Sequence, residues 1–256
     1  MIQFTMTRFL IEIIIVSTFL SVLFGSNATA QPNITAKAWI VADSTGKILD
    51  GTHTTDVRAI ASITKLMTSL IVLDSSQSMT EIIPKKLYNK NLSRQELLNL
   101  AIVKSDNNAA KMLCDYYTGG FKSCVQAMND KAATLEMHSS KFTDPTGLYN
   151  TNVSTAEDLV KLVMAASKYP AIVAASNTPL IKFAISKKKT ASFHNTNNLV
   201  GQGIPFIVSK TGWINASGGC IVMMLRAEHG VRTVILLGSK NTKTRIPEAY
   251  MLSALL

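Results

Sequence analysis

The sequence predicts an α+β fold in which one antiparallel sheet is built from both chain ends and covered by helices, with a helical subdomain alongside. Strand-like apolar runs occur at about residues 36–50 and 204–239, whereas helical periodicity dominates residues from about 60 to 200. Strands and helices do not alternate strictly, and no Gly-x-Gly-x-x-Gly fingerprint follows the first strand. A parallel doubly wound fold is therefore disfavoured.

The strands are predicted from short apolar runs bounded by turn residues. Residues 37–42 and 47–49 are joined across Asp43-Ser44-Thr45-Gly46, which indicates a hairpin. Three later strands are predicted at residues 204–210, 219–226 and 231–238.

The helices are predicted from apolar spacing and from capping residues. Residues 62–73 repeat at helical spacing, and residues 93–103 do so behind a capping box of Ser93 and Glu96. Ser154 and Glu157 stand in the same spacing, so we expect a cap there. Further helices are predicted at residues 108–116, 121–135, 155–167 and 245–256.

The first thirty residues have the pattern of a signal peptide. Arg8 is their only basic residue, an apolar run follows at residues 13–24, and Ala28-Thr29-Ala30 offers small residues for cleavage. That run is shorter than the roughly 20 residues that a membrane-spanning helix needs. We expect cleavage after Ala30 and export to the periplasm or another extracytoplasmic compartment. An uncleaved anchor at residues 9–24 is the alternative, and we expect no stable transmembrane domain after signal removal.

The remaining residues, 31–256, are expected to form one globular domain. The whole chain is 47% hydrophobic and 16% charged, which suits a substantial core and disfavours disorder. Its net charge of +10 survives cleavage because Arg8 and Glu12 leave together. Outside the cytoplasm such a charge attracts wall polymers or lipid headgroups, so nucleic acid is not an expected partner. The basic run Lys187-Lys188-Lys189 is interpreted as a solvated loop.

Three cysteines in an exported chain suggest one disulfide and one remaining thiol. Cys114 and Cys124 are the natural pair because Gly119-Gly120 between them can turn the chain back. Cys220 lies in an apolar run and is expected to be buried. The four histidines are scattered and no Cys-x-x-Cys spacing occurs, so we expect no metal and no cofactor.

Three short motifs carry the chemistry: Ser62-Ile63-Thr64-Lys65, Ser105-Asp106-Asn107 and Lys210-Thr211-Gly212. Residues i and i+3 of a helix are neighbours, so Lys65 can reach the Ser62 hydroxyl. A lysine takes a proton from serine only if desolvation or nearby positive charge lowers its pKa, and Lys210 is a candidate for that charge. The Ser62 N–H lacks an intrahelical partner and can point at a developing oxyanion.

A single motif of this kind is weak support, because Ser-x-x-Lys recurs at residues 44–47 and 186–189, and Ser-x-Asn recurs at residues 239–241. Their order and context are far more specific. The first motif lies on a helix after the N-terminal hairpin, the second in a turn between helices, and the third at the end of a late strand. We therefore treat the combination as one site.

With these motifs the chain resembles the low-molecular-weight penicillin-binding proteins, that is, the D-alanyl-D-alanine carboxypeptidases and endopeptidases. The likeness spans nearly all of the region after the signal and includes AIASITKLMT (59–68), FTDPTGL (142–148), NVSTAEDL (152–159), NTN (195–197) and VSKTG (208–212). It implies a penicillin-binding-protein/serine β-lactamase-like fold. It also implies a serine DD-peptidase that hydrolyses D-alanyl bonds of peptidoglycan and takes β-lactams as covalent inhibitors.

The resemblance implies roles residue by residue. The catalytic residues would be the nucleophile Ser62, its base Lys65, and the proton relay Ser105. Substrate would be held by Asn107, Lys210, Thr211 and Gly212. The oxyanion hole would be formed by the backbone N–H groups of Ser62 and Trp213. The Trp213 side chain either walls the cleft or packs beside the strand.

Two other functions and one finer choice stay open. A class A β-lactamase needs a glutamate as added base, and Glu136 and Glu157 stand in helical contexts instead. A non-catalytic wall-binding module would be free to lose Ser62 or Lys65. Between trimming terminal D-alanine and cutting cross-links, we favour cross-links, because the chain ends at Leu256 and leaves no room for the C-terminal domain that the resemblance associates with major carboxypeptidases.

The remaining site candidates have simpler interpretations. Residues 144–147, Asp-Pro-Thr-Gly, are sufficiently explained by a turn, and His194 is expected at the surface.

Overall fold

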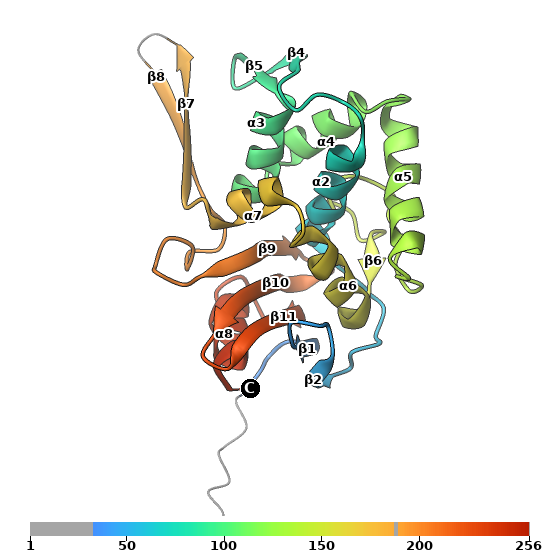
Figure 1. Ribbon diagram of the computed structural model, residues 1–256, viewed down its shortest axis with the longest axis vertical. Helices are drawn as coiled ribbons and strands as arrows, with labels where there is room; N and C mark the ends of the chain where they lie inside the picture. Colours follow the sequence, from blue (N-terminus) through green and yellow to red (C-terminus); the bar gives the residue numbers. More distant parts are fainter. Residues whose placement is uncertain (1–32, 187–188, 256) are drawn as a thin grey trace, which may run out of the picture. The chain divides into compact units, whose positions relative to one another are not determined.

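The computed structural model describes residues 33–186 and 189–255 (Figure 1). The expected signal peptide, residues 1–30, lies outside the described residues, and so do Lys187 and Lys188 of the basic run. Within the described ranges no single helix is long and apolar enough to cross a membrane, although one pair of helices bent by 105° passes the same test together.

Both ends of the chain contribute to one five-stranded antiparallel sheet, as the sequence predicts. The strand order is β2-β1-β11-β10-β9. Strand β1 pairs with β11 from Ala38 opposite Leu237 to Ala42 opposite Thr233, so segments far apart in sequence meet inside the sheet. The bounds are β1 (Ala38–Ala42), β2 (Ile48–Thr52), β9 (Phe206–Ile214), β10 (Gly218–Ala227) and β11 (Gly230–Ser239).

The central strands are buried on both faces, which is why they read as continuous apolar runs. In β11, Val234 and Leu236 pack with helix α8 (Arg245–Leu255), whereas Ile235 and Leu237 pack into the main core. This alternation follows the period of two of a strand. The sheet therefore lies between α8 on one face and the other helices on the opposite face (Figure 1).

The helices lie between the two halves of the sheet in sequence. Their bounds are α2 (Thr64–Asp74), α3 (Arg94–Asn99), α4 (Asn107–Asp115), α5 (Gly120–Thr134), α6 (Ala156–Ala166) and α7 (Pro170–Asn177). A 3-10 turn, η1 (Ala61–Ile63), precedes α2, and a π-helical turn, η2 (Leu100–Lys104), extends α3. The predicted capping box is present: Glu96 N donates to Ser93 Oγ at 3.1 Å and Ser93 N to Glu96 Oε2 at 2.8 Å.

The second predicted cap was wrong by one residue. Thr155 is the N-cap of α6, and its Oγ1 accepts from Asp158 N at 3.1 Å. Ser154 is still extended, because it pairs with Arg58 in a short ribbon of β3 (Arg58–Ala59) and β6 (Val153–Ser154). The helix therefore begins after the ribbon ends.

The region from about 60 to 200 is not wholly helical, contrary to the prediction. Two hairpins interrupt it: β4 (Ile82–Leu87) with β5 (Lys90–Ser93), and β7 (Leu180–Ser186) with β8 (Lys189–His194). Each strand is paired on one side only, and its apolar residues do not alternate clearly in sequence. Such ribbons are stable only when they pack on other elements, so local sequence gives a weak signal for them. Hairpin β7–β8 projects from the body beside β5 (Figure 1).

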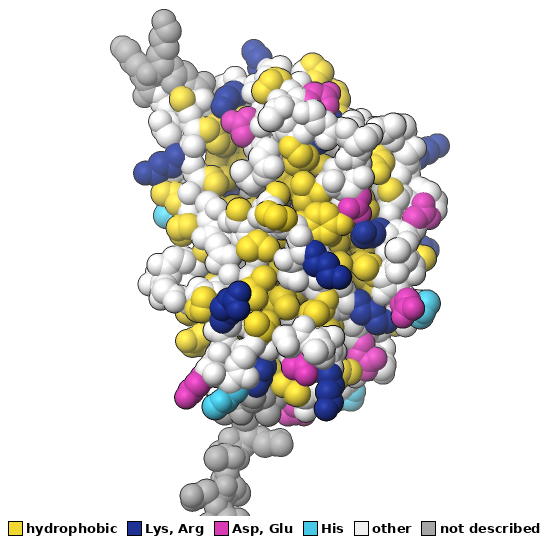
Figure 2. Space-filling model, viewed as in Figure 1, with side chains coloured by type: hydrophobic (Ala, Val, Ile, Leu, Met, Phe, Trp, Pro, Cys, Tyr) yellow, Lys and Arg dark blue, Asp and Glu magenta, His cyan; other side chains and the backbone are white. Residues whose placement is uncertain are grey.

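The basic residues are spread out where the surface can be seen. On the face shown in Figure 2, Lys and Arg side chains lie singly among neutral and apolar ones rather than in one patch. The third lysine of the basic run, Lys189, is exposed at the start of β8.

Candidate active site

Ser62 lies in the tight turn η1, immediately before α2 rather than inside it. The preceding Ala61 has a φ of 47°, a left-handed conformation that only surrounding contacts can hold for a residue with a Cβ. Two glycines provide those contacts. A Cβ at Gly147 would lie 1.8 Å from the Ala61 carbonyl oxygen, and a Cβ at Gly212 would lie 2.9 Å from the Ser62 nitrogen. The backbone of two distant segments therefore closes on this turn.

Lys65 lies one helical turn after Ser62 and is completely buried. Its Nζ donates to Ser62 Oγ at 2.8 Å, to Asn107 Oδ1 at 2.8 Å and to the Thr146 carbonyl at 2.6 Å. The first motif therefore contacts the second motif directly. Three acceptors match the three hydrogens of an ammonium group, and loss of one proton leaves a lone pair within reach of Ser62.

Burial lowers the pKa of Lys65 to about 7, although the charges of Asp144 and Asp106 oppose this shift. Protonated and neutral forms are therefore both populated near neutral pH. The neutral amine can act as a general base toward the Ser62 hydroxyl 2.8 Å away.

The second motif occupies the junction between η2 and α4. Ser105 has a φ of 60° and ends η2, while Asp106 is the N-cap of α4 and accepts from Ala109 N at 3.0 Å. This sharp change of direction sends the side chains on either side of Asp106 to different partners. Asn107 bonds to Lys65, whereas Ser105 bonds to the third motif.

Lys210 of the third motif is buried on β9, and its Nζ donates to Ser105 Oγ at 2.8 Å and to the Thr211 carbonyl at 2.7 Å. Its pKa is well below the ordinary value, first because of burial and then because of the positive charges of Lys65 and Arg245. The structure thus forms two hydrogen-bonded groups, Ser62–Lys65–Asn107 and Ser105–Lys210, which the second motif joins through the chain. The strand continues past the expected end at residue 210 to Ile214, so the motif lies within β9.

The strand that carries the third motif is tied on both sides. Thr211 Oγ1 donates to Thr196 Oγ1 at 2.7 Å, and the Arg245 guanidinium donates to the Gly212 carbonyl. Thr196 follows β8 and Arg245 begins α8. Trp213 is next on β9 with 39% of its surface exposed, which favours a side chain that borders the cleft over one packed beside the strand.

Residues 144–147 take part in the site, which the turn predicted from their sequence does not show. Asp144 Oδ1 accepts from Thr146 N at 2.7 Å and from Gly147 N at 2.9 Å, so the turn interpretation is correct but incomplete. This turn aims the Thr146 carbonyl at Lys65 and places Asp144 where its charge acts on that lysine. The signal in the sequence that could have indicated this role is the FTDPTGL segment at residues 142–148, which is part of the resemblance to the family.

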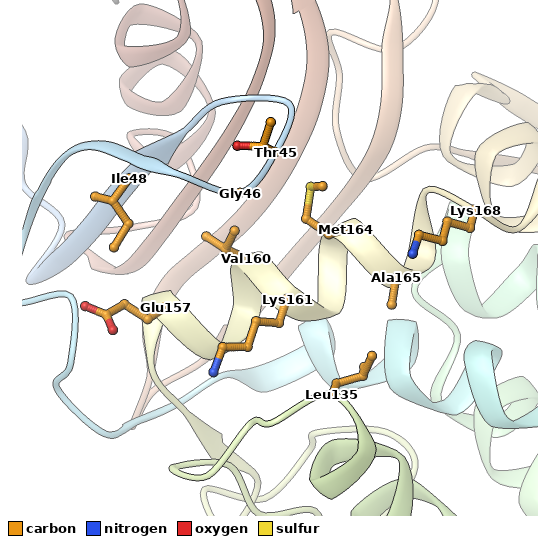
Figure 3. A pocket seen from close by; sticks show the side chains of 10 residues that line it. All are labelled: Thr45, Gly46, Ile48, Leu135, Glu157, Val160, Lys161, Met164, Ala165 and Lys168. Atoms are coloured by element: carbon orange, nitrogen blue, oxygen red, sulfur yellow. The ribbon is translucent and has the colours of Figure 1, made fainter.

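The two glutamates considered as added bases have other contacts. Glu157 Oε1 accepts from Thr54 at 2.6 Å, and the residue lines a pocket of about 380 Å³ between the β1–β2 turn and α6 (Figure 3). The Glu136 carbonyl accepts from Lys161, which lines the same pocket. No residue of the three motifs lines this pocket. The Glu157 carboxylate is therefore committed to Thr54 rather than to a water beside Ser62.

The other candidates are placed as follows. A disulfide joins Cys114 at the end of α4 to Cys124 in α5, with 5.3 Å between the Cα atoms, and Cys220 is a buried free thiol. His194 is exposed at the end of β8. Within the described residues no group of three or more His, Cys, Asp or Glu side chains is arranged to hold a metal ion.

Known proteins match this chain over most of its length. The sequence profile of a family described as D-alanyl-D-alanine carboxypeptidase matches residues 25–88 and 79–240. The D-alanyl-D-alanine endopeptidase of Escherichia coli is 37% identical over 244 residues, which cover 85% of this chain and 79% of that protein. The D-alanyl-D-alanine endopeptidase of Pseudomonas aeruginosa is 33% identical over 265 residues, covering 93% and 86%. A D-alanyl-D-alanine carboxypeptidase of Mycobacterium tuberculosis is 31% identical over 203 residues, covering 73% and 69%.

Solved structures agree with the predicted fold. A penicillin-binding protein of Listeria monocytogenes with ampicillin bound has a TM-score of 0.76 at 25% identity, covering 87% of this chain and 98% of that one. A Streptomyces DD-transpeptidase has a TM-score of 0.76 at 24% identity, covering 86% and 95%, and this likeness bears on the fold alone. The predicted penicillin-binding-protein fold is confirmed.

Proposed function

This chain belongs to the D-alanyl-D-alanine carboxypeptidase family of serine peptidases, and we propose that within that family it is a DD-endopeptidase that cuts peptide cross-links of bacterial peptidoglycan. One observation carries the chemistry. A buried lysine with a pKa of about 7, Lys65, holds its Nζ 2.8 Å from the hydroxyl of Ser62. This is a serine nucleophile beside an amine that is able to accept its proton.

Acylation follows from the contacts of these groups. Neutral Lys65 takes the Ser62 proton as Oγ forms a bond to the carbonyl carbon of a D-alanyl residue. The negative charge on the carbonyl oxygen is received by backbone N–H groups, for which Ser62 and Trp213 are the implied donors. The C–N bond then breaks as the proton that Lys65 took from Ser62 passes through Ser105 to the leaving amine. An ester between substrate and Ser62 remains, and Lys65 is neutral again. Lys210, hydrogen-bonded to Ser105, supports that transfer.

Deacylation reuses the same base. A water gives one proton to Lys65 and attacks the ester carbonyl, and Ser62 leaves with a proton, which restores the hydroxyl. A β-lactam opens by the same attack and forms the same kind of ester. Because Glu157 is bonded to Thr54, it offers no second base for that step, and we expect the penicilloyl ester to persist.

Cross-link cleavage is favoured over removal of terminal D-alanine by the relatives. Three relatives named endopeptidase are 37%, 33% and 30% identical over 85% or more of this chain, while one named carboxypeptidase is 31% identical over 73% of it. An extracytoplasmic location, the periplasm in a Gram-negative cell, is part of the proposal. It is supported by the apolar run at residues 13–24 and by the Cys114–Cys124 disulfide, which persists in oxidising compartments.

Intact-protein mass spectrometry of the full-length chain after incubation with benzylpenicillin tests the chemistry. We expect a stable covalent adduct on the parent and none on Ser62→Ala. The matched control is Ser123→Ala, an exposed serine whose Oγ donates to the Gly119 carbonyl, and it should form the adduct like the parent. Folded parent without an adduct contradicts a serine peptidase, and rapid turnover of the drug would indicate a β-lactamase.

Product analysis on purified muropeptides tests the specificity. Cross-linked dimers and uncross-linked pentapeptides are incubated separately with the parent. Conversion of dimers to monomers supports the endopeptidase. Release of free D-alanine from pentapeptides with dimers left intact contradicts it and assigns a carboxypeptidase.

A further inference from the structure

A second network of charged and aromatic side chains contacts the second motif at Asp106, whose side chain has no hydrogen bond to Lys65. Its centre is Tyr88 in the turn between β4 and β5. The Tyr88 hydroxyl donates to Asp106 Oδ2 and accepts from Lys104 Nζ, and Lys104 Nζ also lies 3.2 Å from Asp106 Oδ2. The three groups form a closed triangle. Neither Tyr88 nor Lys104 has a role in the acylation and deacylation steps proposed above.

Asp106 connects this triangle to the proposed catalytic groups. It is 93% buried and stands between Ser105 and Asn107, and its other oxygen, Oδ1, caps α4 through Ala109 N at 3.0 Å. Burial alone would raise the pKa of Asp106, yet hydrogen bonds from Tyr88, Ala109 and Lys104 hold it below its ordinary value. The carboxylate is therefore charged and is fixed at both oxygens.

Hairpin β7–β8 holds Tyr88 in place. The ring centroid of Tyr88 lies 4.7 Å from that of Phe193 and 6.0 Å from that of Phe183, and Lys104 Nζ lies 4.2 Å from the Phe193 centroid. Rings at such separations attract each other, and a lysine over a ring adds to this. The base of the same hairpin is also attached, because Thr196 N donates to the Val103 carbonyl at 3.0 Å.

The conformation of the second motif makes such support necessary. Ser105 has a φ of 60°, which costs free energy in a residue with a side chain and persists only where neighbours impose it. Asp106 Oδ2 receives hydrogen bonds from Tyr88 and Lys104 there. If the Tyr88 hydroxyl is removed, one of these hydrogen bonds to Asp106, at the junction between η2 and α4, is lost.

We propose that Tyr88 is a positioning residue for Ser105 and Asn107, acting through Asp106, and that Phe183 and Phe193 of hairpin β7–β8 hold it there. The inference rests on the proposed function, because it concerns the rate at which Ser62 is acylated. A displaced Asp106 would lengthen the contacts of Ser105 with Lys210 and of Asn107 with Lys65 together. Of the implied substrate contacts only Asn107 would move, because Lys210, Thr211 and Gly212 lie on β9, so the chemical step should suffer more than binding.

The Tyr88→Phe variant of the full-length chain tests this, because it removes the hydroxyl and keeps the ring. Acylation by benzylpenicillin is followed over a range of concentrations, which separates the limiting rate constant from the half-saturating concentration. We expect the rate constant to fall about tenfold or more, as small displacements of catalytic groups do, while the half-saturating concentration changes less than about twofold.

The chain contains a matched control. The Tyr169 hydroxyl donates to Asp74 Oδ1, and Lys131 Nζ lies 2.8 Å from Asp74 Oδ2, so this is also a tyrosine–aspartate–lysine cluster. It joins α2, α5 and the start of α7 and contains no residue of the three motifs. Tyr169→Phe should acylate at the parent rate with a change in melting temperature similar to that of Tyr88→Phe.

A double-mutant cycle tests the part of the hairpin. Phe193→Leu should slow acylation in the parent and add little to Tyr88→Phe, since both act through the same hydroxyl. The proposal is overturned if Tyr88→Phe acylates at the parent rate or if Tyr169→Phe slows acylation equally. It is also overturned if the effects of Tyr88→Phe and Phe193→Leu on the rate constant simply add in the double variant. If Tyr88→Phe does not fold, the limiting rate constant of acylation of Phe193→Leu alone tests the proposal, and a value equal to that of the parent overturns it. A parent that forms no adduct would instead contradict the proposed function.

Discussion

The Nζ atom of Lys210 lies 2.8 Å from the Oγ atom of Ser105, although the two residues are 105 positions apart in the chain. Ser105 ends a helical turn and Lys210 lies within an edge strand of the main sheet. The second motif carries both this contact, through Ser105, and the contact of Asn107 with Lys65. The contact between Ser105 and Lys210 joins the helical part of the molecule to the sheet at the proposed active site.

Removing the Lys210 amino group should slow acylation. Lys210→Met keeps an unbranched apolar side chain but removes the amino group, so Ser105 loses its partner. We expect the rate of acylation by benzylpenicillin to fall roughly 100-fold, the size of effect seen when one electrostatic donor is removed from an active site. Stopped-flow or quenched mass spectrometry measures it. Lys240→Met, at an exposed lysine, should leave the rate unchanged; equal rates in all three proteins would contradict a role for Lys210.

The rate of acylation should depend on pH through Lys65. The base must be neutral to accept the Ser62 proton, and burial lowers its pKa to about 7. The rate at low drug concentration should therefore rise with pH up to about 7 and level off above it, falling about tenfold per unit on the acidic side. A profile that is flat through this region would show that Lys65 is not the base.

Asp144→Asn should move this acidic limb toward lower pH. The Asp144 charge raises the pKa of Lys65 against the effect of burial, so its removal lets that pKa fall further. Asparagine can still accept the hydrogen bonds that Thr146 and Gly147 donate to Oδ1. The measurement is the pH profile of acylation beside that of Asp130→Asn, an exposed carboxylate, which should not move. A shift toward higher pH would contradict the assignment.

Gly212→Ala should slow the acylation of Ser62 although it removes no reacting group. An added Cβ would lie 2.9 Å from the Ser62 nitrogen and 3.0 Å from the Ile60 carbonyl, so β9 and η1 would have to separate. We expect acylation to slow by about 100-fold because the proposed oxyanion donors lose their alignment. Acylation rates and circular dichroism of the same preparation check this. A folded variant that acylates like the parent would show that the approach of β9 to Ser62 is not needed.

Opening the disulfide should destabilise the helical region. Cys114 and Cys124 are separated by 10 residues, and closing a loop of that size contributes about 3 kcal/mol in the chain-entropy estimate. Urea unfolding of the Cys114→Ser, Cys124→Ser double variant should show a loss of about this size. Reductant should lower the free energy of unfolding of the parent to that of the double variant. The Cys220→Ala variant should be destabilised by reductant in the same way as the parent. A parent insensitive to reductant would contradict a stabilising bridge.

Sequence periodicity was sufficient where an element is buried against the rest of the molecule. The apolar runs that became β10 and β11, and the capping box that starts α3, were both recognisable because burial and capping impose a fixed residue pattern. Hairpin β7–β8 was not recognised, since its strands take their stability from packing on Tyr88 and η2. The cap of α6 was misplaced by one residue because the pairing of Ser154 with Arg58 keeps the chain extended there.

The sequence by itself determined the fold class and the groups that we propose to react, because the three motifs and the apolar pattern are local properties of the chain. Tertiary structure alone decided how those groups act on one another. The pKa of Lys65 depends on burial and on Asp144, 79 residues away. The turn that presents Ser62 depends on Gly147 and Gly212, whose missing side chains admit the Ala61 and Ser62 backbone. Distances and desolvation between remote segments exist only after folding, so no pattern along the chain records them.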